Sequence, residues 1–116
     1  MRILVVEDEE KLAASLKEGL EADSYTVTVA HSGEEGFYLV HTQPFDLIIL
    51  DVLLSGKDGR LICRKLKGQE ETRHIPIIMI SAHPGADRSV REVGADDFLA
   101  KPFEVDALLA MVARYV

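Results

Sequence analysis

Carboxylates follow two apolar runs of this chain, at the point where each run ends. Glu7 and Asp8 come directly after Ile3–Val6, and Asp51 follows the run Phe45–Leu50. A run as apolar as the second is typical of a strand that is buried on both faces of a parallel sheet. The carboxyl ends of such strands form the edge at which open α/β sheets bind their ligands. We therefore expect the three carboxylates to meet at one edge of a sheet.

A cluster of this kind predicts a site for a hard cation. Mg²⁺ prefers oxygen ligands and is commonly held by one or two carboxylates together with waters and a phosphate oxygen. Asp8 and Asp51 are candidates for direct ligands, and Glu7 could bind directly or through a water. A carboxylate beside the metal could also act as a nucleophile, because carboxylates form acyl phosphates. Asp51, at the end of the most apolar run, is the candidate for that role.

Ser81 and Lys101 follow two later apolar runs and are expected at the same edge. The Lys101 ammonium could pair with the Asp51 carboxylate or with a phosphoryl oxygen. The Ser81 hydroxyl could donate a hydrogen bond to a phosphoryl group. A metal and a lysine would together stabilise the charge on a transferring phosphoryl group, so these residues predict phosphoryl transfer to Asp51.

The elements that must position these residues alternate along the chain. The predicted strands are Arg2–Val6, Tyr25–Val29, Asp46–Asp51, Ile77–Ser81 and Asp97–Ala100. The predicted helices are Lys11–Ala22, Gly33–Thr42, Gly59–Gln69, Ala86–Val93 and Val105–Tyr115. Strict alternation predicts a parallel sheet with right-handed crossovers and helices on both faces, which is a doubly wound α/β domain.

Length and composition narrow the function classes. A chain of 116 residues predicts one domain, and a net charge of −7 makes direct nucleic-acid binding by this chain unexpected. The single cysteine, Cys63, excludes an internal disulfide. No apolar run is long enough to span a bilayer and no leader opens the sequence, so we expect a cytoplasmic protein without a membrane contact.

The motifs, taken together, resemble the receiver domains of bacterial two-component response regulators. The matching segments are Glu7–Glu9, Ile48–Asp51, Asp58–Gly59, Ser81–Ala82, Gly94–Phe98 and Lys101–Phe103. They extend over nearly the whole chain in the order that the family has. The resemblance implies a flavodoxin-like (βα)5 fold with strand order 2-1-3-4-5, and one receiver domain over residues 1–116 without an output domain.

The resemblance also implies roles for single residues. Asp51 would accept a phosphoryl group from a sensor histidine kinase or a phosphotransfer protein in a reaction that requires Mg²⁺, assisted by Ser81 and Lys101. The implied metal ligands are Glu7, Asp8, Asp51 and the backbone carbonyl of Leu53. Ser81 and Phe98 would act as the switch residues, and the Lys101–Pro102 peptide bond would be cis.

The acyl phosphate is then expected to alter the surface formed by the fourth and fifth βα units. This surface spans Ile77–Ser81, Ala86–Val93, Asp97–Ala100 and Val105–Tyr115. The last three of these segments could also join two copies of the chain in a homodimer.

Two departures from the family pattern predict local differences. Position 55 is serine where the family often has proline, which predicts a looser turn over Ser55–Gly59. Pro84 and Gly85 are a poor start for a helix, so the fourth helix is predicted to be short.

Three other functions are compatible with parts of the pattern. An aspartyl-phosphate hydrolase on a similar sheet generally needs a second acid two residues after the nucleophile, where this chain has Leu53. A flavin-binding electron carrier needs a phosphate loop after the first strand, where Glu7–Glu10 would repel a phosphate. A scaffold receiver that is not phosphorylated stays open, as do plainer roles: Asp8 could cap a helix, and Phe98 could be a core residue.

Overall fold

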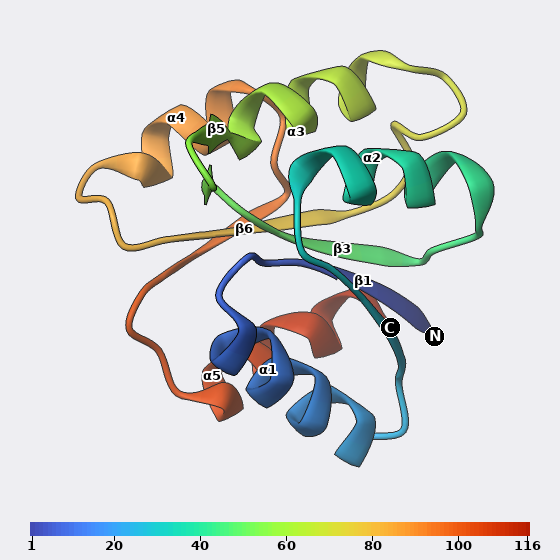
Figure 1. The fold of residues 1–116 in the computed structure, drawn as a ribbon, viewed down its shortest axis with the longest axis vertical. Coiled ribbons are helices and arrows are strands. Elements are labelled where there is room, and N and C mark those ends of the chain that lie inside the picture. The colour runs from blue at the N-terminus through green and yellow to red at the C-terminus, as the bar shows by residue number, and fades with distance from the viewer.

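The computed structural model describes all residues from Met1 to Val116, and its strands and helices alternate along the chain (Figure 1). A five-stranded parallel sheet has the order β2-β1-β3-β6-β7. Its strands are β1 (Arg2–Val6), β2 (Thr26–Ala30), β3 (Leu47–Asp51), β6 (Ile77–Ser81) and β7 (Asp97–Ala100). Because β6 and β7 are the fourth and fifth strands of this sheet along the chain, the predicted order 2-1-3-4-5 is confirmed.

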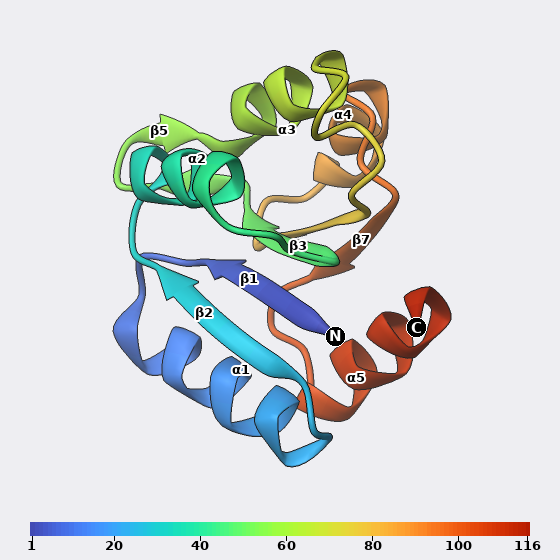
Figure 2. The same ribbon diagram turned by 90° about the vertical axis from the view of Figure 1, so that its right-hand side faces the viewer.

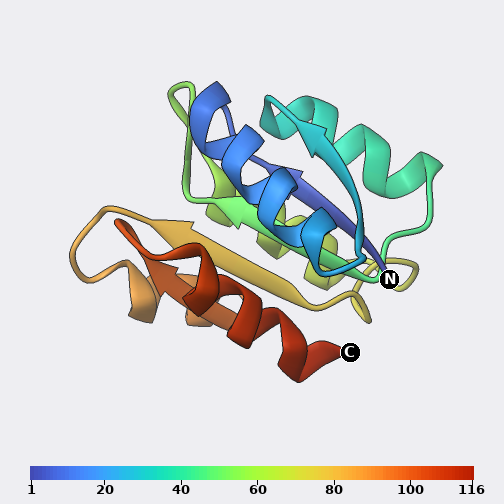
Figure 3. The same ribbon diagram turned by 90° about the horizontal axis from the view of Figure 1, so that it is seen from below.

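Helices cover both faces of this sheet, as Figures 2 and 3 show. The helices are α1 (Glu10–Ala22), α2 (Gly33–Thr42), α3 (Gly59–Gly68), α4 (Ala86–Glu92) and α5 (Val105–Val112). Helices α1 and α5 pack on one face, against a core cluster that includes Ile3 and Val5. Helices α2, α3 and α4 cover the other face, where Leu4 and Val6 belong to a second cluster. Successive side chains of β1 thus point into the core clusters on opposite faces of the sheet, as the two-residue period of a strand requires.

The predicted elements are all present, and most of their ends lie within one residue of the prediction. The fifth helix differs most, because it ends at Val112 and a 3₁₀ turn, η1 (Ala113–Tyr115), continues the chain. Ser32 caps α2, since its hydroxyl accepts a hydrogen bond from the Glu35 N–H at 3.1 Å. None of the helices combines the length and the apolar composition that crossing a bilayer requires.

The turn after Asp51 forms a hairpin that was not predicted from the sequence. Two short strands, β4 (Leu53–Leu54) and β5 (Lys57–Asp58), pair antiparallel and form a hairpin. Its turn residues Ser55 and Gly56 have φ of 47° and 81°, and positive φ at both central positions is typical of a type I′ hairpin turn. Proline, whose φ is fixed near −65°, could not adopt this conformation at position 55. The looser turn over Ser55–Gly59 stays a prediction.

Candidate phosphoryl-transfer site

The sheet brings Glu7, Asp8 and Asp51 together at its carboxyl edge. Strands β1 and β3 are hydrogen-bonded neighbours with Val6 opposite Leu50, so the residues that follow them lie side by side. One carboxylate oxygen from each of the three acids lies within 4.8 Å of the others. The expectation that these acids converge is thus confirmed, and all three present the hard oxygen ligands that Mg²⁺ prefers.

Lys101 joins two of these carboxylates from the far side of β6. Its Nζ donates hydrogen bonds to Glu7 Oε1 at 2.9 Å and to Asp51 Oδ2 at 2.7 Å. Burial lowers the pKa of Lys101, but the bonds to Asp51 and Glu7 outweigh that effect and raise its pKa overall. The ammonium group therefore stays charged and offsets the repulsion between the two acids. The Lys101–Pro102 peptide bond is cis, as the resemblance implied.

Glu7 is the most deeply buried acid of the site, with none of its surface exposed. Burial, which disfavours the ionised form, raises its pKa to about 7, although the bond to Lys101 acts in the opposite direction. The neighbouring Asp51 raises the pKa of Glu7 further. The second oxygen of Glu7 accepts a hydrogen bond from the Glu9 N–H at 3.1 Å. Glu7 thus takes up a proton near neutral pH more readily than an ordinary glutamate.

Asp8 is held by a residue that the sequence did not single out as part of the site. The Ser55 N–H and the Ser55 hydroxyl each donate to Asp8 Oδ2 at 2.8 Å. These bonds, led by the one from the hydroxyl, lower the pKa of Asp8 below its usual range. In the sequence, Ser55 stood out only because the family often has proline at this position. The sequence did not predict the positive φ that directs its N–H and hydroxyl toward Asp8.

Ser81 and Leu53 lie on the wall of a cleft of about 490 Å³ that also contains the acids. Ser81 is buried, and its hydroxyl accepts a hydrogen bond from the His83 N–H at 3.0 Å. The Leu53 N–H points to Asp51 Oδ1 at the long distance of 3.4 Å, while the Leu53 side chain is 68% exposed. The structure thus places both residues beside Asp51, and their chemical roles stay predictions.

Gly59 lets the start of α3 approach the backbone of Asp51. A Cβ at this position would lie only 2.0 Å from the Asp51 carbonyl oxygen, so no other residue fits without moving the chain. The preceding residue, Asp58, caps α3 by accepting the Arg60 N–H at 2.9 Å. The guanidinium of Arg60 turns back to bind the Asp58 carboxylate, and its Nη1 donates to Ser89 Oγ of α4 at 2.9 Å. This link from α3 to α4 was not predicted.

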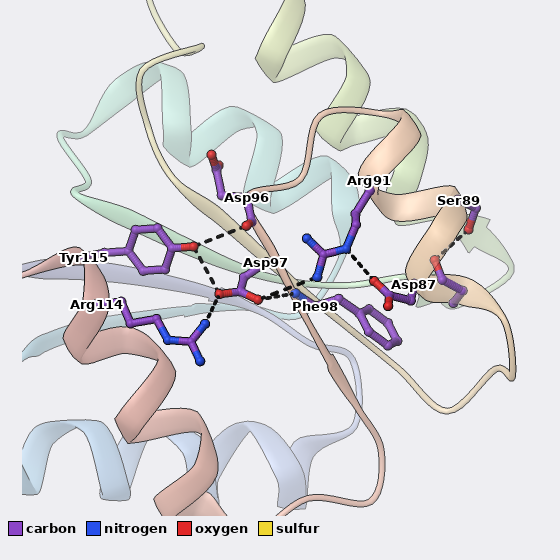
Figure 4. Close-up of polar contacts among 9 residues, drawn as sticks. Asp87, Ser89, Arg91, Asp96, Asp97, Phe98, Arg114 and Tyr115 are labelled. Atoms are coloured by element: carbon purple, nitrogen blue, oxygen red, sulfur yellow. Dashed lines mark hydrogen bonds and ion pairs between the residues drawn. The ribbon is translucent and has the colours of Figure 1, made fainter.

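Phe98 lies on the edge strand β7, partly buried against the core cluster beneath α4. The neighbouring Asp97 faces the other way and is buried, as Figure 4 shows. It accepts hydrogen bonds from Arg114 Nη1 at 3.0 Å and from the Tyr115 hydroxyl at 3.2 Å, while Arg91 of α4 lies 4.0 Å away. The strand that carries Phe98 is therefore tied to both α4 and the C-terminal turn.

Comparison with known proteins agrees with this geometry. The family model of the response regulator receiver domain matches residues 3–113. The chain belongs to this family. Receiver domains are the phosphorylation-based switches of two-component signalling, and this describes the chain at the level of its family.

Curated relatives include response regulators of different lengths. The chain is 40% identical over 113 residues to the phosphate regulon transcriptional regulatory protein PhoB of Rhizobium meliloti, covering 96% of this chain and 50% of that protein. It is 41% identical over 113 residues to the response regulator PleD of Caulobacter vibrioides, covering 96% of this chain and 25% of PleD. The chain thus spans half or less of the length of these relatives.

Solved receiver structures superpose over almost the whole chain. The signal receiver domain of a signal transduction histidine kinase from Syntrophus aciditrophicus matches with a TM-score of 0.90 and 38% identity, covering 98% of this chain and 88% of that one. The receiver domain of Francisella response regulator 1452 matches with a TM-score of 0.90 and 30% identity, covering 98% and 94%.

Proposed function

We propose that Asp51 is the phosphoacceptor of this receiver and that it takes its phosphoryl group from a histidine kinase or a phosphotransfer protein. The observation that carries the proposal is the position of Lys101 Nζ, 2.7 Å from Asp51 Oδ2 and 2.9 Å from Glu7 Oε1. A buried carboxylate at a strand end that is aligned by a lysine and opens into a cleft has the geometry that acyl phosphate formation needs.

The transfer itself makes one bond and breaks one. A carboxylate oxygen of Asp51 attacks the phosphorus atom, and the bond between phosphorus and the donor nitrogen breaks, so that the electron pair stays on the donor histidine. Lys101 stabilises the negative charge of the phosphoryl oxygens. The Ser81 hydroxyl, now bonded to the His83 N–H, can turn to donate to one of those oxygens.

Glu7, Asp8 and Asp51 fit a magnesium ion, because three carboxylate oxygens lie within 4.8 Å of one another and Ser55 favours the ionised form of Asp8. We propose that these acids, with the backbone carbonyl of Leu53, hold Mg²⁺. When bound, the ion would supply positive charge that neutralises the phosphoryl oxygens as they approach the acids.

The proposed response follows from the position of α4. Rotation of Ser81 toward a phosphoryl group would shift the loop Ala82–Gly85, which leads into α4. Phe98 packs in the core cluster beneath the same helix. We propose that the acyl phosphate favours a second arrangement of β6, α4, β7 and α5, with Ser81 and Phe98 as the switch residues. A homodimer through α4, β7 and α5 belongs to this proposal, as does the absence of direct nucleic-acid contact, which the net charge of −7 supports.

Intact-mass spectrometry tests the proposal. Incubation with acetyl phosphate and Mg²⁺ should add one phosphoryl group, and EDTA should prevent it. The variant Asp51→Asn should stay unmodified, whereas Asp46→Asn, at the opposite end of the same apolar run, should be modified like the parent. Modification that persists in Asp51→Asn would place the phosphoacceptor elsewhere. No modification of the parent protein would favour a scaffold receiver.

The same samples separate a switch from an aspartyl-phosphate hydrolase. Leu53, two residues after Asp51, is apolar and 68% exposed, so it can act neither as an acid nor as a base on the leaving group. A switch should therefore keep its acyl phosphate long enough for intact-mass spectrometry to detect the phosphorylated protein. Continuous release of inorganic phosphate with many turnovers per chain would instead support the hydrolase.

A further inference from the structure

Both hydrogen bonds that Ser55 donates converge on a single oxygen of Asp8. The Ser55 N–H and the Ser55 Oγ each lie 2.8 Å from Asp8 Oδ2. A carboxylate oxygen offers about two lone-pair positions, and these two donors occupy both of them on Oδ2. Asp8 Oδ1 is then the oxygen that stays available to a ligand in the cleft.

The hairpin fixes this pair of donors in place. Leu53 pairs with Asp58 and Leu54 with Lys57, so Ser55 and Gly56 form the tight turn between two paired strands. Ser55 has φ of 47° in that turn, and its N–H and hydroxyl both face Asp8. One of the two donors is a backbone group and cannot rotate away. The hydrogen bond from the Ser55 N–H to Asp8 Oδ2 is therefore fixed by the backbone conformation of the hairpin.

The other two acids are bonded differently. Glu7 accepts one bond on each oxygen, from Lys101 Nζ and from the Glu9 N–H. Asp51 accepts Lys101 on Oδ2, and its Oδ1 has only the long contact of 3.4 Å to the Leu53 N–H. Asp8 is thus the acid of the cluster in which one oxygen accepts two hydrogen bonds from the same residue, Ser55.

We propose that Ser55 restricts Asp8 to binding a cation through one oxygen and thereby makes the site prefer Mg²⁺ to Ca²⁺. This inference rests on the proposed metal site. Ca²⁺ takes about six to eight oxygens and often binds both oxygens of one carboxylate, whereas Mg²⁺ is satisfied by single oxygens from one or two carboxylates plus waters. Engaging Asp8 Oδ2 therefore removes a ligand that Ca²⁺ would use and that Mg²⁺ does not need.

The variant Ser55→Gly tests this role, because glycine keeps the positive φ and the N–H but lacks the hydroxyl donor. Ser24→Gly is a matched control, since Ser24 is exposed, has φ of 70° and lies in the turn after α1. Each protein is titrated with MgCl₂ and with CaCl₂, without a phosphoryl donor. The two dissociation constants come from amide chemical shifts in ¹H–¹⁵N correlation spectra.

We expect the ratio of the Ca²⁺ to the Mg²⁺ dissociation constant to fall by at least about threefold in Ser55→Gly, because Asp8 can then offer a second oxygen. The ratio should be unchanged in Ser24→Gly. Ser55→Ala also lacks the hydroxyl and should shift the ratio in the same direction, which provides a second measurement if the glycine variant is unstable.

Two results would overturn the inference, and they differ in meaning. If the parent and both Ser55 variants bind the two cations with the same ratio, Ser55 does not set selectivity although the metal site stands. If the parent binds neither cation, the proposed metal site fails, and the role of Ser55 fails with it.

Discussion

The two sides of the cleft are held in different ways. On the acidic side, Glu7 and Asp51 are buried at the ends of central strands and share the Lys101 ammonium. On the opposite side, the exposed loop Ala82–Gly85 leads from β6 into α4, a helix of only 7 residues. The proposed phosphoacceptor thus lies at the buried end of a central strand, whereas the segment proposed to respond ends in a short helix with a small buried face. We therefore expect phosphorylation on the acidic side to alter the loop and α4 without disturbing the core.

The helices that follow β1 and β6 show the same difference. Helix α1 has 13 residues and buries Ala13, Leu16 and Leu20 in the core. Helix α4 buries only Ala86 and Val90, and its N-cap, Gly85, provides no side-chain bond. A short helix with little burial has low local stability, because isolated helices of this length are marginal in water.

Hydrogen exchange measured by NMR tests the difference in local stability between α1 and α4, for which we expect the largest effect. Amides in the middle of α1 should exchange only through global unfolding, whereas those of α4 should open locally and exchange on the order of 100-fold faster. Fluoroberyllate with Mg²⁺, which mimics a bound phosphoryl group, should slow exchange in α4 and leave α1 unchanged. Equal protection of the two helices would show that the proposed switch segment is as stable as the core.

Much of this arrangement could be predicted from the sequence. The apolar run before Asp51 and the alternation of strands and helices are strong patterns, and a parallel sheet necessarily brings Glu7, Asp8, Asp51 and Lys101 to one edge. A turn at Gly94 after α4 could also be predicted, because glycine is common just after the C-terminus of a helix. It is realised with the Ala95 N–H donating to the Val90 carbonyl at 3.1 Å, which is typical of a Schellman motif.

The parts that could not be predicted depend on tertiary contacts. The hairpin strands have two residues each, which is too short for any periodicity. Its turn depends on a serine with positive φ, which is uncommon and is stabilised here by the bonds to Asp8. The link from Arg60 to Ser89 joins residues 29 positions apart, and it exists only because the fold brings α3 beside α4.

The pH dependence of the free energy of unfolding reports on the protonation of Glu7, on the acidic side of the cleft. The folded-state pKa of Glu7 is about 7, above the value of 4.5 for an ordinary glutamate. Its contribution to stability is therefore fully present below about pH 4.5 and is lost as the pH rises through 7. The pKa of Asp8 is lowered, so Asp8 loses its contribution to the free energy of unfolding only at more acidic pH. It does not affect the change in stability between pH 4.5 and pH 7.

We expect Glu7→Gln to remove most of this dependence and to raise the free energy of unfolding at pH 8 by about 2 kcal/mol relative to the parent. Urea unfolding at intervals from pH 5 to pH 8 measures the effect. Glu18→Gln, on the exposed side of α1, should leave the pH profile of the parent unchanged. A profile for Glu7→Gln that is parallel to the parent would show that Glu7 is ionised throughout this range.

The smallest expected effect concerns the hydrogen bond from Arg60 of α3 to Ser89 of α4. Ser89 Oγ accepts a hydrogen bond from Arg60 Nη1 at 2.9 Å and donates to the Ala86 carbonyl at 2.9 Å. In Ser89→Ala, the loss of a hydrogen bond to a charged group at this half-exposed position destabilises α4 by about 1 kcal/mol. The higher helix propensity of alanine stabilises the helix by about 0.5 kcal/mol. Exchange of the α4 amides should therefore become about twofold faster.

Ser15→Ala provides the matched control, because Ser15 is exposed on α1 and its side chain forms no hydrogen bond in the structure. This variant gains the same helix propensity without losing a contact, so exchange in α1 should become slightly slower or stay the same. Opposite effects of one substitution in the two helices would show that α4 depends on its neighbour α3, whereas α1 is stabilised by its own buried face. If Ser89→Ala slows exchange in α4 as well, the Arg60 bond does not stabilise the helix. The weak attachment of α4 would then have to be explained by its short buried face alone.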